Sequence, residues 1–290
     1  MAVLRTVALL LVGLTAYYLY TPDTFSEEMV RGKRVLVTGA SMGIGEQIAY
    51  EFARMGAHLM VTARSEKRLQ EVVQKCVELG AGSAQYVLAD MSNLTLAQQV
   101  VEETQRKLGG LDYLVLNHVG GTSGFGPFEG DMESLTSCMT INFLSYVQLT
   151  VAAMDMLQES QGGIIVLSSI AGRLSSPFTV AYSSAKFALE GFYGSLRHEL
   201  QIRNIRLDIT VAVLGLIDTD TATKQVDGKL AMQASPKEDC AREVVRAGVL
   251  RHREVFFPYW ITKPAVLLRD WAPELLEAMA AKKYRLENIL

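Results

Sequence analysis

Short apolar runs alternate with longer amphipathic stretches along most of this 290-residue chain, and this alternation restricts its fold more than any other feature. The apolar runs have the length of strands, and the stretches between them have the length of helices. Apolar strands joined by helices belong to a parallel sheet that helices cover on both faces. We therefore predict an α/β fold with a doubly wound, mostly parallel sheet. The predicted strands are residues 34–38, 58–62, 84–89, 113–116, 164–167, 207–213 and 255–257, and the predicted helices are residues 45–55, 65–79, 94–108, 139–156, 182–201 and 236–250.

Composition excludes several functional classes. The chain has 28 Lys and Arg against 31 Asp and Glu, a net charge of −3, which argues against a nucleic-acid partner. Hydrophobic residues make up 49% and charged residues 20%, so the chain can bury a core. Three scattered cysteines, Cys76, Cys138 and Cys240, fit neither a disulfide framework nor a zinc cluster. We predict no metal site.

The first twenty residues form a separate apolar segment. Thr6–Tyr20 has no charged residue and is marginal in length for a membrane span. A cleaved signal peptide is one interpretation, because its apolar region has this length. An uncleaved signal-anchor is favoured, because no small-residue cleavage site follows and the tyrosines near Tyr20 resemble an interfacial aromatic belt. Residues 1–20 are thus predicted to be a membrane anchor or signal segment, and residues 21–33 a linker.

The last residues differ in character from the alternating region, which we place at 34–258. Residues 259–290 are predicted to form a helical extension rich in apolar side chains, among them Trp260 and Trp271. Core packing with a dimer contact is one interpretation of these side chains. A membrane-facing apolar lip around a substrate entrance is the other.

A glycine-rich turn, TGASMGIG at residues 38–45, joins the first predicted strand to the first predicted helix. Glycines there permit a tight turn and let the backbone approach a pyrophosphate, which the helix N-terminus stabilises. The spacing is G-x-x-x-G-x-G, and such a turn alone also fits a simple strand–helix connection. Its place at the start of a β–α–β unit favours the dinucleotide site of a Rossmann-like fold.

The end of the second predicted strand indicates which dinucleotide binds. An acidic residue there accepts the ribose 2′-OH of NAD, whereas an arginine pairs with the 2′-phosphate of NADP. The chain has Arg64 and Ser65 at this point, and Ser41 in the glycine-rich turn adds a hydroxyl donor. The alternative is that Arg64 is only a solvated residue at a helix start. We predict NADP(H) as the cofactor.

Tyr182 and Lys186 lie four residues apart in a predicted helix and therefore share one face of it. A tyrosine has a reference pKa of about 10. A cation one turn away should lower the pKa of Tyr182, so that the phenol can exchange a proton with a carbonyl oxygen. Ser169 follows a buried strand, and ligands bind at the carboxyl ends of strands in such sheets. We predict that Ser169, Tyr182 and Lys186 are catalytic.

The same spacing recurs at Tyr259 and Lys263, directly before Pro264. Proline disrupts the interior of a helix, so this second pair is not expected to lie within a continuing helix. We therefore predict that it has no catalytic role.

Together these motifs resemble those of the short-chain dehydrogenase/reductase superfamily, whose fold is Rossmann-like. The motifs that carry the resemblance are TGASMGIG (38–45), NHVG (117–120), INFLSY (141–146), SSIAG (168–172) and YSSAK (182–186). The segments LVLNHVGG, INFLSYVQLT and VLGLIDT are similar to the 11-beta-hydroxysteroid dehydrogenase type 1 group, and especially to the 11-beta-hydroxysteroid dehydrogenase 1-like proteins. The resemblance covers residues 1–258.

The resemblance implies a role for each matching residue. Tyr182 would be the general acid/base, Lys186 would tune its pKa and bind the ribose, and Ser169 would hydrogen-bond the substrate oxygen. Asn142 would hold a water that connects Lys186 to solvent, although capping of a backbone group is an alternative. Ser169, Tyr182, Leu214 and Gly215 would bind substrate. The implied cofactor-binding residues are Gly39, Ser41, Met42, Gly43, Ile44, Gly45, Arg64, Ser65, Asp90 (adenine), Met91, Asn117 (adenosine ribose), His118, Val119, Tyr182, Lys186, Ile217, Thr219 and Thr221 (nicotinamide side).

Three positions depart from the pattern of the relatives. Met42 stands where NADP-preferring relatives often have a basic residue, so more of the discrimination falls on Arg64. His118-Val119-Gly120 replaces the commoner Asn-Ala-Gly continuation, a change that the subgroup shares. Ser176 stands before Pro177, where the corticosteroid enzyme has an aromatic residue. The glycine-rich segment 120–130 borders the expected substrate cleft.

The resemblance implies an NADP(H)-dependent oxidoreductase that interconverts a ketone and a secondary alcohol on a lipophilic, steroid-like substrate. A retinoid or other lipid ketone reductase, and a catalytically silent cofactor-binding protein, remain alternatives. A homodimer at the endoplasmic reticulum membrane is expected, with a lumenal catalytic domain and a usable glycosylation sequon at Asn93. Cleavage of the leader would instead give a secreted protein.

Overall fold

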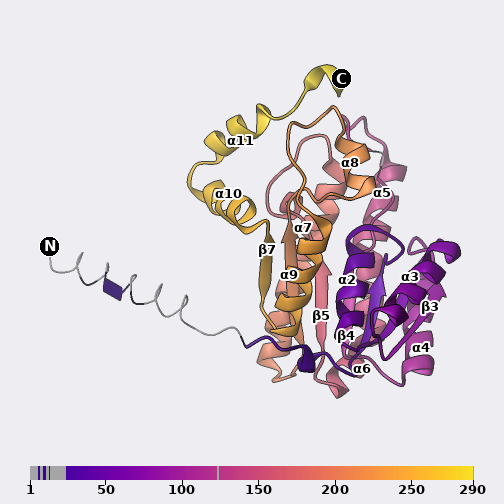
Figure 1. Ribbon diagram of the computed structural model, residues 1–290. Helices are drawn as coiled ribbons and strands as arrows, with labels where there is room; N and C mark the ends of the chain where they lie inside the picture. The colour runs from indigo at the N-terminus through magenta and orange to yellow at the C-terminus, as the bar shows by residue number, and fades with distance from the viewer. Residues whose placement is uncertain (1–5, 7–8, 11–12, 14–23, 123, 290) are drawn as a thin grey trace.

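The computed structural model describes residues 24–122 and 124–289, together with Thr6, Leu9, Leu10 and Gly13. Its described strands form one fully parallel sheet in the order β3-β2-β1-β4-β5-β6-β7 (Figure 1). This confirms the predicted α/β, Rossmann-like fold. The strands are β1 (Arg34–Thr38), β2 (His58–Ala63), β3 (Ser83–Leu88), β4 (Tyr113–Leu116), β5 (Gly163–Leu167), β6 (Asp208–Leu214) and β7 (Glu254–Phe257).

Helices cover the sheet on both faces, because alternate residues of each strand point to opposite sides. Val35 and Val37 of β1 pack in one apolar core with helices α2, α3 and α9, whereas Leu36 packs in a second core with α4, α6 and α7. The described helices are α2 (Gly43–Arg54), α3 (Glu66–Glu78), α4 (Leu94–Leu108), α5 (Met132–Met139), α6 (Ser145–Glu159), α7 (Val180–Ile202), α8 (Asp220–Val226), α9 (Lys237–Val249), α10 (Tyr259–Trp271) and α11 (Pro273–Ala281), with short turns η1 (Glu27–Met29), η2 (Thr140–Leu144), η3 (Ile170–Gly172) and η4 (Leu286–Asn288).

The chain reverses its direction across the sheet at β1. Strands β2 and β3 extend to one side of β1, and β4 to β7 extend to the other side. The loops after β1 and β4 therefore separate, and open α/β sheets bind their ligands in the crevice between such loops. The glycine-rich turn follows β1 and Asn117 follows β4, so both lie at this crevice.

Two helical segments differ from the prediction. The helix predicted over residues 139–156 begins earlier, at α5, and passes through the π-helical turn η2 before α6. Helix α8 was not predicted, because it buries none of its side chains and so has no apolar period in its sequence.

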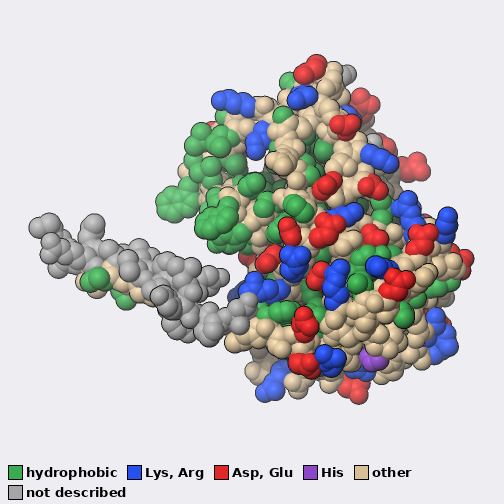
Figure 2. Space-filling model, viewed as in Figure 1, with side chains coloured by type: hydrophobic (Ala, Val, Ile, Leu, Met, Phe, Trp, Pro, Cys, Tyr) green, Lys and Arg blue, Asp and Glu red, His purple; other side chains and the backbone are tan. Residues whose placement is uncertain are grey.

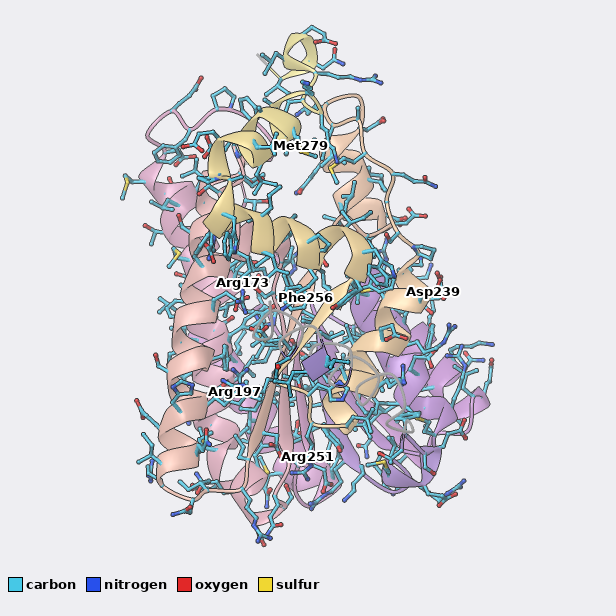
Figure 3. The ribbon with its side chains drawn as sticks, turned by 90° about the vertical axis from the view of Figure 1, so that its left-hand side faces the viewer. Arg173, Arg197, Asp239, Arg251, Phe256 and Met279 are labelled. Atoms are coloured by element: carbon cyan, nitrogen blue, oxygen red, sulfur yellow. The ribbon has the colours of Figure 1, made fainter. Side chains whose placement is uncertain are left out.

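The prediction that no helix continues through Pro264 is wrong, since α10 contains this proline. Proline removes one backbone hydrogen bond, at a cost of about 3 kcal/mol in a helix interior. Packing favours the helix nonetheless, because Thr262 is fully buried and its hydroxyl donates to Pro258 O at 2.9 Å. The ammonium group of Lys263 lies over the Phe256 ring, 4.1 Å from its centre, where α10 crosses β7 (Figure 3).

Among the described residues, one helical run, Met132–Glu159, is long and apolar enough to cross a membrane. Tyr146, Leu149 and Ala153 in this run are fully buried in the second core, so the run serves here as a core helix. The predicted N-terminal anchor, residues 1–20, lies outside the described residues except for Thr6, Leu9, Leu10 and Gly13.

Helices α10 and α11 carry an exposed apolar surface at one end of the molecule (Figure 2). We call it the C-terminal apolar surface. Trp260 and Trp271 are 85% and 88% exposed, so these rings do not pack in the core of this chain. The surface consists of Tyr259, Trp260, Ile261, Leu267, Trp271, Leu275 and Met279.

Candidate active site

The glycine-rich turn is packed directly against the end of β4. The side-chain amide of Asn117 donates to Thr38 O and to Gly39 O, both at 3.1 Å. A Cβ on Gly45 would lie 2.3 Å from that amide nitrogen and 2.4 Å from Gly39 O, so only glycine fits there. Gly39 itself has φ +63°, which also favours glycine. The turn is therefore a backbone cradle that no side chain fills.

A buried histidine joins this cradle to the neighbouring helix. The Nδ1 atom of His118 lies 2.9 Å from Thr38 Oγ1, and its Nε2 lies 3.0 Å from Ile141 O and 2.6 Å from Ser145 Oγ. Burial and the nearby charge of Lys186 lower the pKa of His118 to about 3, so the ring is neutral. The predicted cofactor role of His118 can therefore involve only its backbone, since every hydrogen bond of its ring is to protein.

The predicted catalytic residues meet at the carboxyl ends of β5 and β6. Ser169 follows β5, and its hydroxyl lies 3.4 Å from Leu214 O and hydrogen-bonds to Tyr182. Lys186 is 2% exposed, and its Nζ donates to Leu167 O at 2.7 Å and lies 5.6 Å from the centre of the Tyr182 ring. The sequence spacing thus brings the serine, the phenol and the ammonium into one cluster.

Burial has the largest effect on the pKa of Tyr182. Burial raises the pKa of Tyr182 above its ordinary value, and the hydrogen bond from Ser169 lowers it by less. Desolvation of the phenolate thus dominates here, and the lowering of this pKa by Lys186 stays a prediction. At neutral pH the phenol is protonated, which is the state that can donate a proton.

Lys186 is itself perturbed. Burial lowers its pKa to about 8, while Cys138 and Glu190 act in the opposite direction. Nζ also lies 5.3 Å from the centre of the Tyr146 ring, which favours the cation. Lys186 therefore carries its charge at neutral pH and loses it in mildly alkaline solution.

Asn142 lies in the middle of the π-helical turn η2, a feature that is frequent at functional sites. Its Nδ2 donates to Gly120 O at 2.6 Å and to Cys138 O at 2.8 Å, and its Oδ1 accepts from Gly120 N at 3.2 Å. The side chain therefore fixes the loop after β4 to the helix, as the capping alternative expects. The water-holding role implied by the resemblance stays a prediction. Because the side chain of Asn142 is engaged in these contacts, the backbone of Asn142 would have to bind the water.

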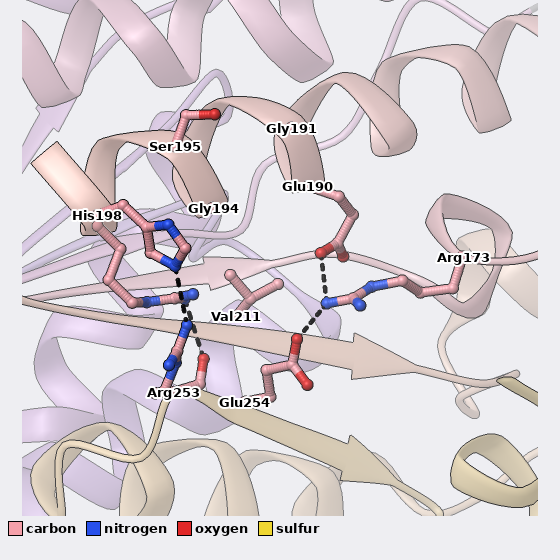
Figure 4. A pocket seen from close by; sticks show the side chains of 10 residues that line it. Arg173, Glu190, Gly191, Gly194, Ser195, His198, Val211, Arg253 and Glu254 are labelled. Carbon is pink, nitrogen blue, oxygen red and sulfur yellow. Dashed lines mark hydrogen bonds and ion pairs between the residues drawn. The ribbon is translucent and has the colours of Figure 1, made fainter. Parts of the chain in front are cut away.

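Close packing sets the position of Ser169 against the catalytic helix. A Cβ on Gly172 would lie 2.8 Å from Lys186 O, so glycine lets the turn η3 touch α7. Ser168 donates to Glu190 Oε1 at 2.7 Å, and Glu190 lies one turn beyond Lys186. Arg173 pairs with Glu190 at 2.6 Å and also with Glu254 of β7 (Figure 4).

This ion-pair network borders a hollow of about 400 Å³ beside α7 (Figure 4). Arg197 and Arg253 line the same hollow, and Arg197 donates to Ile209 O at 2.9 Å. None of the predicted catalytic or cofactor residues lines it. The hollow therefore lies behind the catalytic helix and is not the substrate cleft.

The adenosine side of the crevice contains the predicted arginine. Arg64 is exposed at the carboxyl end of β2, and Ser65 begins α3. The Asp90 carboxylate accepts from Ser92 N at 2.9 Å, and this bond, with a smaller effect of Arg64, holds the pKa of Asp90 below its usual range. Met91 is buried beside it.

The other side of the crevice is formed by the segment after β6. Thr219 begins α8, where its Oγ1 accepts from Ala222 N at 3.3 Å, and its methyl group lies close to Gly43. Ile217 is 3% exposed and Thr221 is exposed. The structure thus places α8 across the crevice from the glycine-rich turn. The Leu214 side chain packs in the core, so only its backbone can meet a substrate.

Sequence reasoning missed an aromatic cluster that two loops and the C-terminal tail form. The rings of Phe125, Phe178 and Tyr284 pack together, with centres 5.5–6.0 Å apart. Gly126 N donates to Phe178 O at 3.0 Å, which ties the loop after β4 to a residue four positions before Tyr182. No sequence motif links these three positions, because they come from two loops and the C-terminal tail.

Comparison with known proteins agrees with this geometry. The chain belongs to the short-chain dehydrogenase family, whose profile, described as short chain dehydrogenase, matches residues 33–230. The chain is therefore an oxidoreductase of a family that uses NAD(P)(H). Within the family, it is 60% identical over 280 residues to the hydroxysteroid 11-beta-dehydrogenase 1-like protein A of Xenopus laevis, covering 97% of this chain and 96% of that protein. The resemblance drawn from the motifs is confirmed.

Solved structures share the fold. A short chain dehydrogenase/reductase from Burkholderia phymatum in complex with NAD has a TM-score of 0.75 at 20% identity, covering 87% of this chain and 96% of that chain. A short chain dehydrogenase from Shigella flexneri 2a complexed with NADP has a TM-score of 0.72 at 24% identity, covering 80% of this chain and 98% of that chain. The two neighbours hold different cofactors, so the choice of cofactor here depends on this chain's own residues.

Proposed function

We propose that this protein is an NADP(H)-dependent oxidoreductase that interconverts a ketone and a secondary alcohol on a lipophilic, steroid-like substrate. The observation that carries the proposal is the cluster of Ser169, Tyr182 and the buried Lys186 at the edge of the sheet that holds the glycine cradle. Three polar groups that converge at one end of a crevice can position and protonate a single oxygen atom.

The residues present fit a nicotinamide dinucleotide. The cradle at Gly39 and Gly45 leaves room for a pyrophosphate, and the N-terminus of α2 points its free N–H groups at this place. When bound, the dinucleotide supplies or accepts the hydride. Lys186 would bind one ribose group and Asn117 would contact the adenosine ribose, as the motifs of the family imply.

The catalytic residues act on the substrate oxygen. Ser169 donates a hydrogen bond that holds the carbonyl oxygen, and the protonated Tyr182 donates the proton that turns this oxygen into a hydroxyl group. The raised pKa of Tyr182 keeps this acid loaded at neutral pH, which suits reduction. In the reverse direction Tyr182 must first lose its proton, so alcohol oxidation is expected to accelerate as pH rises.

Arg64 is expected to set the preference for NADP. Substitution Arg64→Asp removes a partner of the 2′-phosphate and places a negative charge beside it. Charge-assisted hydrogen bonds contribute about 1.5–3 kcal/mol, so the affinity for NADPH should fall about 10- to 150-fold, with that for NADH equal or improved. Equilibrium titration of both reduced dinucleotides checks this. An unmutated protein that prefers NADH would contradict the cofactor proposal.

Apolar features favour a lipophilic substrate. Phe178 lies four residues before Tyr182 and packs with Phe125 and Tyr284, and flat ring systems pack well against such rings. The C-terminal apolar surface would suit a membrane interface, and with the predicted anchor it would draw substrate from a bilayer (Figure 2). The relative from Xenopus laevis is itself named as hydroxysteroid dehydrogenase-like.

A substrate panel tests this function. The purified full-length chain is mixed with NADPH and with steroid, retinoid and other lipid ketones, and NADPH consumption is followed by absorbance. Turnover of steroid ketones above the others supports the proposal. Turnover of only retinoid or other lipid ketones would replace steroids as the proposed substrate class. Binding of NADPH without turnover of any ketone would indicate a catalytically silent cofactor-binding protein.

We also propose that the protein is a homodimer. Val151 on α6 and Val180 and Phe187 on α7 are exposed apolar residues on neighbouring helices, a surface that a second copy would cover. Light scattering in mild detergent should give twice the 31.9 kDa of one chain. Val151→Glu should yield monomers, whereas Ile202→Glu at the far end of α7 should not. A monomeric unmutated chain would refute the dimer.

A further inference from the structure

The loops after β1 and β2 border one space at the edge of the sheet. These strands are parallel neighbours, so Met42 after β1 and Arg64 after β2 lie on the same edge of the sheet. Met42 is the residue before α2 and Ser65 is the residue before α3, and neither side chain caps its helix. Two helix N-termini with free N–H groups therefore border this space, which favours negative charge.

A second arginine reaches into the same space. Arg68, in the first turn of α3, extends to Met42, and its Nη1 lies 3.1 Å from the Met42 sulfur. A thioether is a weak acceptor, so this hydrogen bond positions the guanidinium and engages only one of its donors, weakly. Arg68 is exposed, and among the described residues neither it nor Arg64 forms an ion pair. Both cations are therefore free to bind an anion.

The acidic residues beside these arginines are engaged elsewhere. Glu46, in the first turn of α2, accepts from the Tyr50 hydroxyl at 3.0 Å. Glu66, in the first turn of α3, accepts from the Tyr86 hydroxyl at 2.9 Å. These carboxylates accept from tyrosines and form no ion pair with Arg64 or Arg68. The arginine donors therefore stay available where the ribose 2′ position of a dinucleotide in the cradle would face the end of β2.

We propose that Arg68 is a second specificity residue for the 2′-phosphate of NADP and that it supplies the cation that Met42 does not. This rests on the proposed cofactor. Arg64 and Arg68 would approach the phosphate from the two sides of the space, and Met42 would hold Arg68 in place. A lysine at position 42 would put its ammonium group where the Arg68 guanidinium now lies, so the two arrangements are interchangeable.

The test uses two small probes that differ only in the 2′-phosphate, adenosine 2′,5′-bisphosphate and adenosine 5′-monophosphate. Their affinities for the full-length chain are measured by calorimetry, so no catalytic step is involved. We expect Arg68→Gln to lower the affinity for the bisphosphate about tenfold, close to 1.4 kcal/mol, and to leave the affinity for the monophosphate unchanged. Met42→Lys in the Arg68→Gln background should restore most of the lost affinity.

Lys67 provides the matched control. It carries the same charge in the same helical turn, but it points about 100° away around the helix, so Lys67→Gln should change neither affinity. The assignment of Arg68 is overturned if Arg68→Gln binds the bisphosphate with the affinity of the unmutated chain. It is also overturned if Lys67→Gln lowers the affinity for the bisphosphate as much as Arg68→Gln does. If the unmutated chain does not distinguish the two probes, the proposed NADP preference is overturned with it.

Discussion

Replacement of Tyr182 by phenylalanine should reduce ketone turnover by two to four orders of magnitude. The substitution deletes one hydroxyl group and keeps the ring beside Lys186, so the fold and the binding of NADPH should persist. General acid assistance contributes about 10²–10⁴ in rate, and the loss here should approach the upper end. Single-turnover reduction at a saturating ketone concentration measures this effect directly.

The chain contains its own control for this experiment. Tyr259 and Lys263 repeat the spacing of the catalytic pair, but Tyr259 is 51% exposed on α10 and its ring packs on Trp260. Tyr259→Phe should therefore change turnover less than about threefold, near 0.6 kcal/mol of barrier. Loss of activity in Tyr259→Phe together with retention in Tyr182→Phe would show that the site is assigned to the wrong pair.

The fold could be predicted from the sequence because each strand is short, apolar and followed by a helix of clear period. Strands β1 and β4 have the bounds expected, and each of the other strands differs from its predicted bounds by one residue at one or both ends. Regions without such a pattern were missed. Helix α8 has no buried face, and α10 continues through Pro264 because its contacts with β7 outweigh the local preference of proline.

The site could be predicted only where chemistry is local in sequence. Tyr182 and Lys186 are one helical turn apart, and the spacing alone places them together. The partners that fix the site come from distant segments: Gly120 holds Asn142, and Thr38 holds His118. Charge effects were harder still, because the pKa of Tyr182 depends on how far the ring is buried, and this is known only after folding.

Replacement of Lys186 by methionine should reduce turnover as severely as the loss of the Tyr182 hydroxyl. Methionine has a similar length and fills the same buried space without the charge. The chain would lose the ammonium group beside the Tyr182 ring and the proposed ribose contact, so the affinity for NADPH should fall as well. Tyr182→Phe should not weaken the binding of NADPH, so titration of both variants with NADPH separates the role of Lys186 from that of Tyr182. Equal NADPH affinities would contradict the ribose contact.

The same substitution should also change how stability depends on pH. Burial lowers the pKa of Lys186 to about 8 in the folded chain, against about 10.4 in the unfolded chain. Between these values the unfolded chain binds more protons, so the lysine makes the free energy of unfolding rise with pH in this window. From pH 7 to pH 9 the unmutated chain should therefore gain about 1 kcal/mol relative to Lys186→Met, as measured by denaturant titration. Parallel stability profiles for the two chains would mean that Lys186 is not desolvated, and the expected loss of its charge above pH 8 would then have no basis.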